Sequence, residues 1–500
     1  MADNIMKLQN GSDIRGVALE GIEGEHVNLT AEACNKIGQA FVKWLSENKK
    51  LPAEKLTIGI GRDSRLSGPD LEEAVVKGMV FAGAKVVRCG LATTPSMFMS
   101  IVFDQTKFDG SIMITASHLP FNRNGLKFFN ADGGLEHDDI TKILEYASSE
   151  NQKDADISGC KSFDLISVYA EHLRNAIING VAGGDKPLEG LKIVVDSGNG
   201  ASGFFVDKIL KPLGADTTGS QFLEPDGHFP NHIPNPENKQ AMEAIRSAVL
   251  TNKADLGLIF DTDVDRMSAV LHNGEEVNRD AIIAMISAIL APEYPGSTII
   301  TDSVTSDRLT YFLEKELGLK HLRYMRGYKN VINKQKELNA AGTVAPLAME
   351  TSGHGALKDN YFLDDGAFLA VKMVIAMAKA AKQGKKLDSL IEKLPAPGDE
   401  GEYRFKILEE DFKSYGKKVL AEFKTRAEKA GYTMPDSFEG IRLSFNSSDI
   451  KGWMLLRLSL HDPVMPLNIE GTQTGSLEKI RAIAKELLAG FDKLDMSCLN

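Results

Sequence analysis

Three aspartates stand at alternate positions directly after an apolar segment, in LGLIFDTDVDR (residues 256–266). If this stretch stays extended, Asp261, Asp263 and Asp265 share one side of the chain, and if it bends into a loop, their carboxylates can converge on a point. Like charges about 4 Å apart repel by roughly 4 kcal/mol at an effective dielectric of about 20, so a cation is the natural counterpart. Carboxylate oxygens select a hard ion, Mg²⁺ or Ca²⁺. The spacing predicts a metal site, with a solvated acidic turn as the structural alternative.

The same loop does not fit an EF-hand. Its sixth position would be Arg266 where that motif needs glycine, and its twelfth would be His272 where that motif needs glutamate. A strand followed by Asp-x-Asp also resembles the haloacid dehalogenase-like phosphatases, in which the first aspartate is a nucleophile. Taken alone, the loop does not distinguish a metal site from the nucleophilic aspartate of such a phosphatase.

A second loop combines a hydroxyl, an imidazole and an amine. In IMITASHLPFNRNGLKFF (residues 112–129), Ser117 and His118 follow an apolar run and Lys127 precedes another. The hydrolase elbow Gly-x-Ser-x-Gly is absent, and neighbours in an extended segment point apart, so His118 is a poor candidate base for Ser117. A phosphoserine fits better, because it is a stable phosphoryl donor that needs a divalent cation and positive side chains around it.

The charge balance of the two loops supports this interpretation. Three carboxylates and a phosphate sum to about −5, of which Mg²⁺ compensates only about +2. Arg266 and Lys127 are the cations that the loops themselves offer. The apolar neighbours of Lys127 leave open that its stem only covers apolar surface while the ammonium reaches solvent.

The elements around these loops alternate between strands and helices. Short apolar runs predict buried strands at 55–61, 84–90 and 110–116, with a helix over 68–84. This alternation argues for α/β layers. The same order restarts at 191–215 and at 296–318, which predicts three related α/β domains.

The C-terminal part of the chain follows a different pattern. The stretch 393–405 is rich in proline and glycine and predicts a linker. A smaller α+β block follows, with a strand at 453–460 and a helix at 476–491.

Bulk composition limits the class of protein. The chain has 500 residues, enough for three or four domains. Its 58 basic and 69 acidic residues give a formal charge of −11, which disfavours a nucleic-acid partner. Four scattered cysteines and the lack of a leader segment predict reduced thiols in a cytoplasmic protein. The most apolar helix candidate, residues 367–381, is too short and too charged to span a membrane.

Segments along most of the chain, in family order, resemble the motifs of the α-D-phosphohexomutases, the phosphomannomutase and phosphoglucomutase superfamily. TASHLPFNRNGLK (115–127) is similar to the phosphoserine loop of that family, and DTDVDR (261–266) is similar to its metal loop. The other segments that carry the resemblance are GSDIRG (11–16), GRDSRLSG (61–68), VVDSGNGASG (194–203), PDGHFPNHIPNPE (225–237), METSGHG (349–355) and RLSLHDP (457–463).

The resemblance implies three related α/β domains with mixed sheets and a smaller C-terminal α+β domain, arranged around a central cleft. The expected domains are 1–160 with the phosphoserine loop, 161–275 with the metal loop, 276–395 for sugar binding and 396–500 for phosphate binding. We expect a monomer or a homodimer.

The activity that the resemblance implies is reversible transfer of phosphate between C1 and C6 of a hexose phosphate, with mannose or glucose as the sugar. The reaction would use phospho-Ser117, one Mg²⁺ per chain and a hexose 1,6-bisphosphate, which is both intermediate and activator. The alternatives are a haloacid dehalogenase-like sugar phosphatase and a phosphosugar-binding relative without turnover.

The resemblance also assigns residues to roles by motif position. The implied catalytic residues are Ser117, His118, Lys127 and Arg15. The implied metal ligands are Ser117, Asp261, Asp263 and Asp265, and Arg266 and Arg62 would stabilise charge on the phosphate. The implied substrate ligands are Lys329, Glu350, Ser352, His354, Arg457, Ser459 and His461.

Several segments depart from the family motifs or allow another interpretation. Met349 and Tyr328 replace a glycine and a histidine near the sugar loop, and Leu460 with His461 replaces Gly-Thr in the phosphate loop, so glucose, mannose and glucosamine phosphates all remain open. Arg15 could also be a surface residue, and His354 could only make a local hydrogen bond. The Gly-x-Gly-x-x-Gly pattern at 198–203 is interpreted as a tight turn, because no acidic ribose ligand follows it.

Overall fold

The computed structural model describes residues 5–182, 184–459 and 462–499. The chain forms two compact units. The first contains the described residues up to Asn278 together with Ser352–Ala356 and Leu363–Ser389. The second contains Arg279–Thr351, Leu357–Phe362 and the described residues from Leu390 onward.

The N-terminal part of the first unit is built on an eight-stranded mixed sheet in the order β1-β2-β6-β5-β3-β4-β8, with β7 paired to β6. Strand β3 pairs in parallel with β4 and β5, whereas β6 pairs antiparallel with β5 and β2. The strands are β1 (Gln9–Asn10), β2 (Asp13–Val17), β3 (Thr57–Arg62), β4 (Lys85–Leu91), β5 (Gly110–Ile114), β6 (Arg123–Asn130), β7 (Gly133–Gly134) and β8 (Lys161–Ser162).

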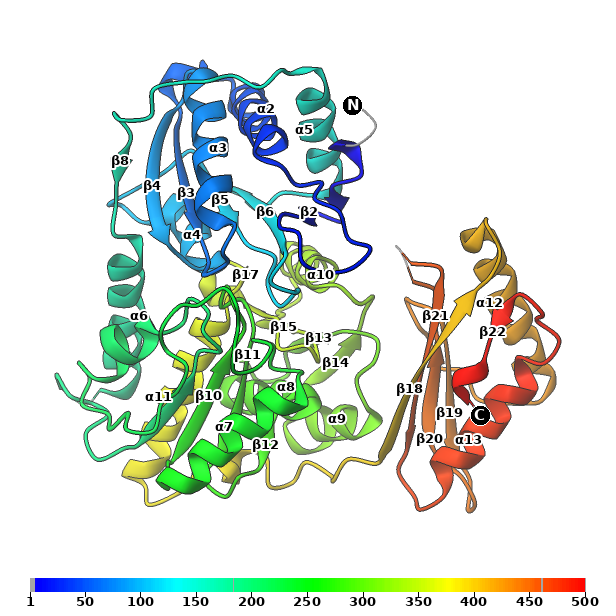
Figure 1. Cartoon of the computed structure of the whole chain (residues 1–500). Coiled ribbons are helices and arrows are strands. Elements are labelled where there is room, and N and C mark those ends of the chain that lie inside the picture. Colours follow the sequence, from blue (N-terminus) through cyan, green and yellow to red (C-terminus); the bar gives the residue numbers. More distant parts are fainter. Residues whose placement is uncertain (1–4, 183, 460–461, 500) are drawn as a thin grey trace. The chain divides into compact units, whose positions relative to one another are not determined.

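Helices cover this sheet, as Figure 1 shows for α2, α3 and α5. They bury the apolar sides that their spacing predicts: Phe41 of α2 packs against Phe128 of β6 with ring centroids 5.0 Å apart. The helices are α2 (Ala31–Lys49), the 3₁₀ turn Ala53–Lys55, α3 (Gly68–Phe81), α4 (Thr94–Val102) and α5 (His137–Ser149).

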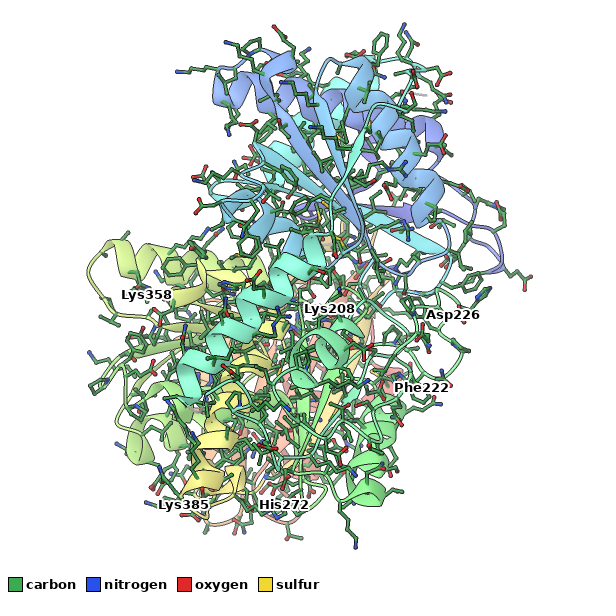
Figure 2. The ribbon with its side chains drawn as sticks, turned by 90° about the vertical axis from the view of Figure 1, so that its left-hand side faces the viewer. Lys208, Phe222, Asp226, His272, Lys358 and Lys385 are labelled. Atoms are coloured by element: carbon green, nitrogen blue, oxygen red, sulfur yellow. The ribbon has the colours of Figure 1, made fainter. Side chains whose placement is uncertain are left out.

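The rest of the first unit carries a four-stranded sheet in the order β12-β11-β10-β9. Its elements are α6 (Leu165–Val181), β9 (Ile193–Asp196), a π-helical segment (Phe205–Leu210), α7 (Lys239–Asn252), β10 (Leu256–Phe260), β11 (Met267–Leu271), β12 (Glu276–Val277), β17 (Leu363–Asp364), α11 (Gly366–Lys382) and the 3₁₀ turn Leu387–Leu390. In Figure 2, Lys208 lies on the π-helical segment beside α6, and its Nζ donates to Ser167 Oγ at 2.8 Å.

The second unit contains a parallel group in which β13 pairs with both β14 and β15. Its elements up to residue 360 are α8 (Arg279–Leu290), β13 (Thr298–Thr301), α9 (Asp307–Tyr311), a π-helical segment (Phe312–Glu316), β14 (Lys320–Arg323), α10 (Tyr328–Ala340), β15 (Leu347–Met349) and the 3₁₀ turn Lys358–Asn360. Strand β16 (Gly355–Leu357) extends from the first unit into the second.

The C-terminal domain of the second unit is an antiparallel sheet in the order β19-β20-β21-β18-β22. Its helices pack against the sheet around buried Phe405, Phe423 and Leu443. The elements are β18 (Asp399–Ile407), α12 (Phe412–Lys429), β19 (Ile441–Asn446), β20 (Lys451–Leu456), β21 (Val464–Gly471), α13 (Ser476–Leu487), β22 (Leu494–Asp495) and the 3₁₀ turn Ser497–Leu499.

The architecture confirms three α/β domains with mixed sheets and a further C-terminal domain. One local prediction was wrong: the segment 393–405 is not a linker throughout, because β18 begins at Asp399 and pairs with β21 along its length. The segment forms a strand because β21 provides hydrogen-bond partners for its backbone N–H and C=O groups. In a free linker these groups would bind water. Among the described residues, no helix combines the length and the apolar composition that crossing a membrane requires.

Candidate active site

The loop that carries Ser117 begins where β5 ends. The side chain of Ser117 is buried, and its backbone φ is +51°. This left-handed conformation costs a residue with a Cβ about 1–2 kcal/mol. The backbone N–H of Ser117 donates to Thr115 Oγ1 at 2.8 Å, so the chain turns sharply at the serine instead of continuing as a strand.

The aspartate loop connects the antiparallel strands β10 and β11. Of the two geometries that the sequence allows, the structure has the bent one, with a positive φ of 68° at Val264. Oxygen atoms of Asp261, Asp263 and Asp265 lie within 4.8 Å of one another, and all three residues are buried. The prediction that these carboxylates converge is confirmed.

The two loops meet at the Ser117 hydroxyl. Ser117 Oγ donates to Asp261 Oδ2 at 2.8 Å and accepts from Arg266 Nη2 at 2.9 Å. Arg266 also donates through Nε to Asp261 Oδ2 at 3.1 Å. A buried hydroxyl is thus held between a carboxylate and a guanidinium.

His118 lies closer to Ser117 than the sequence argument allowed. We reasoned that neighbours in an extended segment point apart, but the left-handed turn at Ser117 brings His118 Nδ1 to 3.3 Å from Ser117 Oγ. Arg266 Nη2 lies 2.5 Å from the same nitrogen. Burial, and then Arg266 and Arg15, lower the pKa of His118 to about 2, so the imidazole is neutral and Nδ1 accepts a hydrogen bond from the Arg266 guanidinium.

Lys127 reaches the aspartate loop from β6. Its Nζ donates to Asp263 Oδ2 at 3.0 Å and to Asp265 Oδ2 at 2.5 Å. The Oδ1 atoms of both aspartates are buried and have no hydrogen-bond partner among the described residues. Buried carboxylate oxygens without a partner are costly. The all-oxygen donor set therefore fits a hard divalent cation, which this loop could hold.

The titration behaviour of the loop follows from its charges. Burial, and then the carboxylates of Asp265 and Asp263, raise the pKa of Asp261 well above its usual value. Burial also acts to raise the pKa of Asp265, but Lys127 and His354 outweigh it and lower this pKa below the usual value. A divalent cation bound here would favour the ionised form of Asp261.

Arg15, on β2, extends toward the serine loop. Its Nη1 donates to the carbonyl of Ala116 at 3.0 Å, and its Nη2 pairs with Asp13 at 3.0 Å. The carbonyl that Arg15 binds belongs to the residue before Ser117. This contact supports a role for Arg15 near Ser117 over the alternative that it is only a surface residue. Arg62, in contrast, pairs with Glu72 at 3.1 Å, so its predicted contact with phosphate stays a prediction.

A glycine-containing turn of the second domain packs against the aspartate loop. A Cβ on Gly200 would lie 2.8 Å from Thr262 Cα, and Asn199 has a φ of +62°. The glycine pattern at 198–203 is thus a tight turn packed on the metal loop, as predicted. Asp196, at the end of β9, accepts from His232 Nε2 at 3.0 Å, and the His232 ring packs edge-on against Phe222, which Figure 2 labels.

His354 and Ser352 of the sugar-loop motif belong to the first unit. His354 Nδ1 lies 2.5 Å from Asp364 Oδ2 and 3.9 Å from Asp265 Oδ1. Burial acts to lower the pKa of His354, but Asp364 and Asp265 raise it to about 9, so it is a cation beside the metal loop. The Ser352 hydroxyl is buried and makes no hydrogen bond with the part of the chain that the structure describes.

The remaining predicted ligands belong to the second unit. Glu350 is buried and accepts from the Gly327 backbone N–H at 2.6 Å. Lys329 lies in the first turn of α10. Arg457 follows β20, and its Nη1 lies 3.6 Å from Glu439 Oε1. Ser459 Oγ accepts from the Asp462 backbone N–H at 3.2 Å, and His461 lies outside the described residues.

Besides Asp364 at His354 and Glu72 at Arg62, sequence reasoning missed three residues that the structure places in contact with predicted ones. They are Arg65, which bonds the serine loop, Thr94, which bonds Asp263, and Glu439, which pairs with Arg457. Arg65 stands in the GRDSR segment, so that motif was a usable signal for it. Glu439 and Thr94 stand in no segment whose spacing pointed to chemistry.

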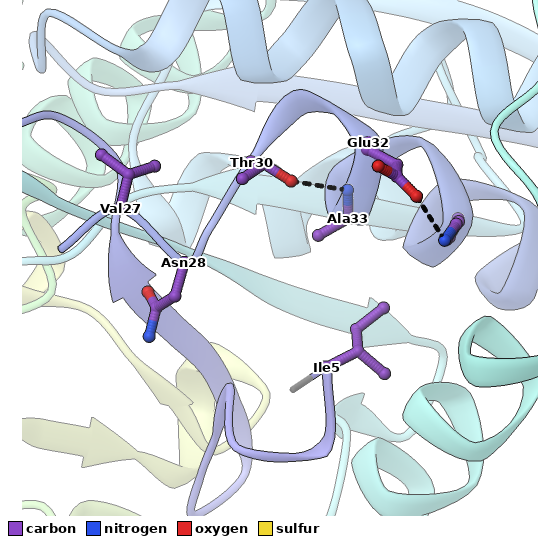
Figure 3. Close-up of a pocket in the computed structure, with 7 residues that line it drawn as sticks. Ile5, Val27, Asn28, Thr30, Glu32 and Ala33 are labelled. Carbon is purple, nitrogen blue, oxygen red and sulfur yellow. Dashed lines mark hydrogen bonds and ion pairs between the residues drawn. The ribbon is translucent and has the colours of Figure 1, made fainter. Parts of the chain in front are cut away.

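A pocket of about 360 Å³ lies at the start of α2 (Figure 3). Thr30 caps this helix by accepting from the Ala33 backbone N–H at 3.1 Å, and Glu32 pairs with Lys36 at 2.6 Å. None of the predicted site residues lines this pocket. It therefore adds nothing to the candidate active site.

Comparison of the sequence with family models decides the class of protein. Residues 6–154, 167–274 and 278–397 match domains I, II and III of the family described as phosphoglucomutase/phosphomannomutase, alpha/beta/alpha domain. The chain belongs to this family. It is therefore a phosphohexomutase of the α-D-phosphohexomutase superfamily, an isomerase that transfers a phosphoryl group within a hexose phosphate.

Curated relatives and solved structures agree over nearly the whole chain. A phosphoglucomutase/phosphomannomutase of Thermococcus kodakarensis is 30% identical over 92% of this chain and 93% of its own length. A phosphomannomutase/phosphoglucomutase of Pseudomonas aeruginosa is 27% identical over 96% of both chains. The crystal structure of a family protein from Burkholderia thailandensis has 25% identity and a TM-score of 0.79, and the match covers 97% of this chain and 98% of that one.

Proposed function

We propose that this phosphohexomutase interconverts the 1-phosphate and the 6-phosphate of glucose or mannose, with Ser117 as the phosphoryl carrier. The observation that supports this most directly is the Ser117 hydroxyl, held between Asp261 and Arg266 beside three converging carboxylates. The names of the Thermococcus and Pseudomonas relatives support glucose and mannose as the sugars.

The reaction begins with phospho-Ser117 and a hexose monophosphate. The free sugar hydroxyl attacks the phosphorus, the bond from phosphorus to Ser117 Oγ breaks, and the hydroxyl proton leaves to a base. The resulting hexose 1,6-bisphosphate turns end for end, and Ser117 Oγ attacks its other phosphorus. The bond from that phosphorus to the sugar oxygen breaks, and the sugar oxygen takes back a proton to become the hydroxyl of the product. Arg266 Nη2, at 2.9 Å from Ser117 Oγ, stabilises charge on the serine oxygen, and Lys127 and Arg15 are the candidates for proton transfer or charge stabilisation.

Mg²⁺ is the proposed metal, with Asp261, Asp263, Asp265 and the oxygen on Ser117 as its ligands. The ion would supply charge neutralisation for the transferring phosphoryl. The Oδ1 atoms of Asp263 and Asp265, which accept no hydrogen bond from any described residue, support this assignment.

The remaining roles are proposed by motif position. Glu350, Ser352, His354 and Lys329 would bind sugar hydroxyls or phosphate, and Arg457, Ser459 and His461 would hold the distal phosphate. The Ser352 Oγ and Arg457 Nε atoms are buried and make no hydrogen bond with the described part of the chain, which supports two of these assignments.

We propose the same four domains for these roles, with boundaries at 1–160, 161–275, 276–395 and 396–500. A cytoplasmic monomer or homodimer is also part of the proposal, and the free thiols of Cys34, Cys89, Cys160 and Cys498 support a reducing compartment.

The test combines a phosphate-transfer assay with mass analysis of Ser117. With Mg²⁺ and catalytic glucose 1,6-bisphosphate, ³¹P spectra should show glucose 1-phosphate converting to glucose 6-phosphate without release of inorganic phosphate. Peptide mapping should find phosphate on Ser117. Ser117→Ala should lower kcat by at least about 10³-fold, because the covalent carrier is lost.

Ser149→Ala, an exposed serine of α5, is the matched control and should leave kcat unchanged. Release of inorganic phosphate as the main product would indicate a phosphatase instead. Binding of phosphosugar without turnover would indicate a non-catalytic relative, and full activity of Ser117→Ala would exclude the covalent route.

A further inference from the structure

We propose that Arg65 is a positioning residue for the phosphoryl carrier: it fixes the left-handed turn at Ser117 by binding the carbonyl oxygens of the serine loop. The inference rests on the proposed role of Ser117 and deepens it. Among the described residues, the Arg65 guanidinium bonds backbone carbonyls and makes no hydrogen bond to the Ser117 hydroxyl or to the aspartate loop.

The guanidinium of Arg65 is almost wholly buried and binds four backbone carbonyls of the same loop. Its Nη2 donates to the carbonyl of Ser117 itself. The same nitrogen donates to the carbonyl of Leu119 at 2.6 Å. Its Nη1 donates to the carbonyls of Pro120 and Arg123, at 2.8 and 2.9 Å. The planar fork of an arginine can serve four acceptors at once, which no other side chain can do.

The loop is fixed from its N–H side as well. Asp63 lies 3.4 Å from Arg65 Nε and accepts from the Thr115 hydroxyl at 2.7 Å. Thr115 Oγ1 in turn accepts from the Ser117 N–H at 2.8 Å. Arg65, Asp63 and Thr115 therefore hold both polar groups of the Ser117 backbone, the carbonyl directly and the N–H through one hydroxyl.

The outer side of Arg65 is closed by the second domain. The Phe229 ring lies over the guanidinium at 5.3 Å, within cation–π distance. A Cβ on Gly227 would lie 2.5 Å from Leu66 N and 2.6 Å from Ser64 O, so only glycine allows this loop to reach the Arg65 turn. The guanidinium is consequently shielded from water, and its hydrogen bonds are not exchanged with solvent.

This network answers a requirement of the chemistry. The backbone of Ser117 is strained at a φ of +51°, and the chain could relax to an ordinary conformation if nothing held it. The hydroxyl has to return to the same place with and without phosphate, and a displacement of about 1 Å can cost about 10²-fold in rate. Arg65 keeps the carrier in place across both states.

The decisive variant is Arg65→Lys, which keeps the charge but offers a single nitrogen in place of the fork. We expect kcat to fall by about 10²-fold or more, with KM for glucose 1-phosphate and the affinity for Mg²⁺ changed by less than about threefold. The rate at which glucose 1,6-bisphosphate phosphorylates Ser117, followed by intact mass, should fall in parallel with kcat. Arg88→Lys, an ion-paired arginine of β4, is the matched control and should keep wild-type values.

A second pair of variants covers the case in which Arg65→Lys does not fold. Thr115→Val removes the hydroxyl that binds the Ser117 N–H, and it should lower kcat by about tenfold or more while Thr115→Ser restores it. A purely structural role would lower the melting temperature but leave kcat per folded molecule unchanged in these variants, and that result would overturn the inference.

The outcome for Ser117→Ala separates this inference from the proposed function. If Ser117→Ala is fully active, the covalent mechanism is wrong and the inference falls with it. If Ser117→Ala is inactive while Arg65→Lys and Thr115→Val turn over at the wild-type rate, only the positioning role of Arg65 is wrong.

Discussion

Asp263 connects three parts of the site through one carboxylate. Its Oδ2 accepts from Lys127 Nζ at 3.0 Å and from Thr94 Oγ1 at 2.5 Å, whereas its Oδ1 is buried without a hydrogen-bond partner in the described chain. The residue is therefore held by β6 and α4 on one side and has a free oxygen for a metal on the other. At the scale of single residues, the metal proposal depends most on this side chain.

Asp263→Asn should lower the affinity for Mg²⁺ by more than about 10²-fold, since loss of an outer-shell partner alone costs about 10–100-fold. Titration calorimetry with Mg²⁺ measures this directly. Asp207→Asn, an exposed aspartate paired with Lys211, is the matched control. Unchanged Mg²⁺ affinity together with metal-independent turnover in Asp263→Asn would restore the interpretation of the loop as an acidic turn.

At the scale of elements, the N-terminus of α4 is joined to the metal loop. The Thr94 backbone N–H donates to the Asp263 carbonyl at 2.9 Å, in addition to the bond between its hydroxyl and the carboxylate. The helix cap itself is Thr93, which forms a reciprocal pair with Ser96. Of these two adjacent threonines, Thr93 caps the helix and Thr94 bonds Asp263, a proposed metal ligand.

Thr94→Val, which replaces the hydroxyl with a methyl group, should weaken Mg²⁺ binding by about 10–100-fold with little loss of stability, and Thr94→Ser should retain the affinity. Thr93→Val should show the opposite pattern, a loss of about 1 kcal/mol in stability with normal Mg²⁺ affinity. Metal titration and urea unfolding of the three variants measure both quantities. Equal Mg²⁺ affinities in Thr94→Val and the wild type would remove the link between α4 and the metal loop.

At the scale of the whole molecule, the chain has several separate cores. One lies under the first sheet and includes Phe41 and Phe128, and another lies under the C-terminal sheet and includes Phe423 and Leu443. The two clusters share no residue. Chains with separate cores often unfold in more than one step, so stability has to be assigned to each core.

Leu443→Ala should destabilise the C-terminal domain by about 2–5 kcal/mol, because a fully buried leucine leaves a cavity. We expect an early unfolding step in calorimetry. Mg²⁺ binding by the first unit should persist throughout the temperature range of that step. Leu408→Ala, at a leucine that is 62% exposed, should leave the profile unchanged. Simultaneous loss of metal binding and of the C-terminal fold would show that the cores unfold together.

The sequence by itself determined the properties that depend on local pattern. Apolar runs followed by helical spacing predicted β3, β4, β5 and α3 within a few residues, since period and chain direction are properties of consecutive side chains. The aspartates of 261–265 were recognisable because they follow a buried strand at fixed spacing. Motif order was sufficient for the family.

Only the tertiary structure decided which side chains meet. The segment after Ala116 looked extended, but the chain makes a left-handed turn at Ser117, where Arg65 and Thr115 bond the backbone and His118 lies beside the hydroxyl. Lys127 finds Asp263 across 136 positions of sequence. Arg62 and Arg65 are the same residue type and lie three positions apart at the end of β3. Their side chains take different directions, so Arg62 pairs with Glu72 and Arg65 binds the serine loop. Such choices depend on long-range packing, which residue types and spacing do not contain.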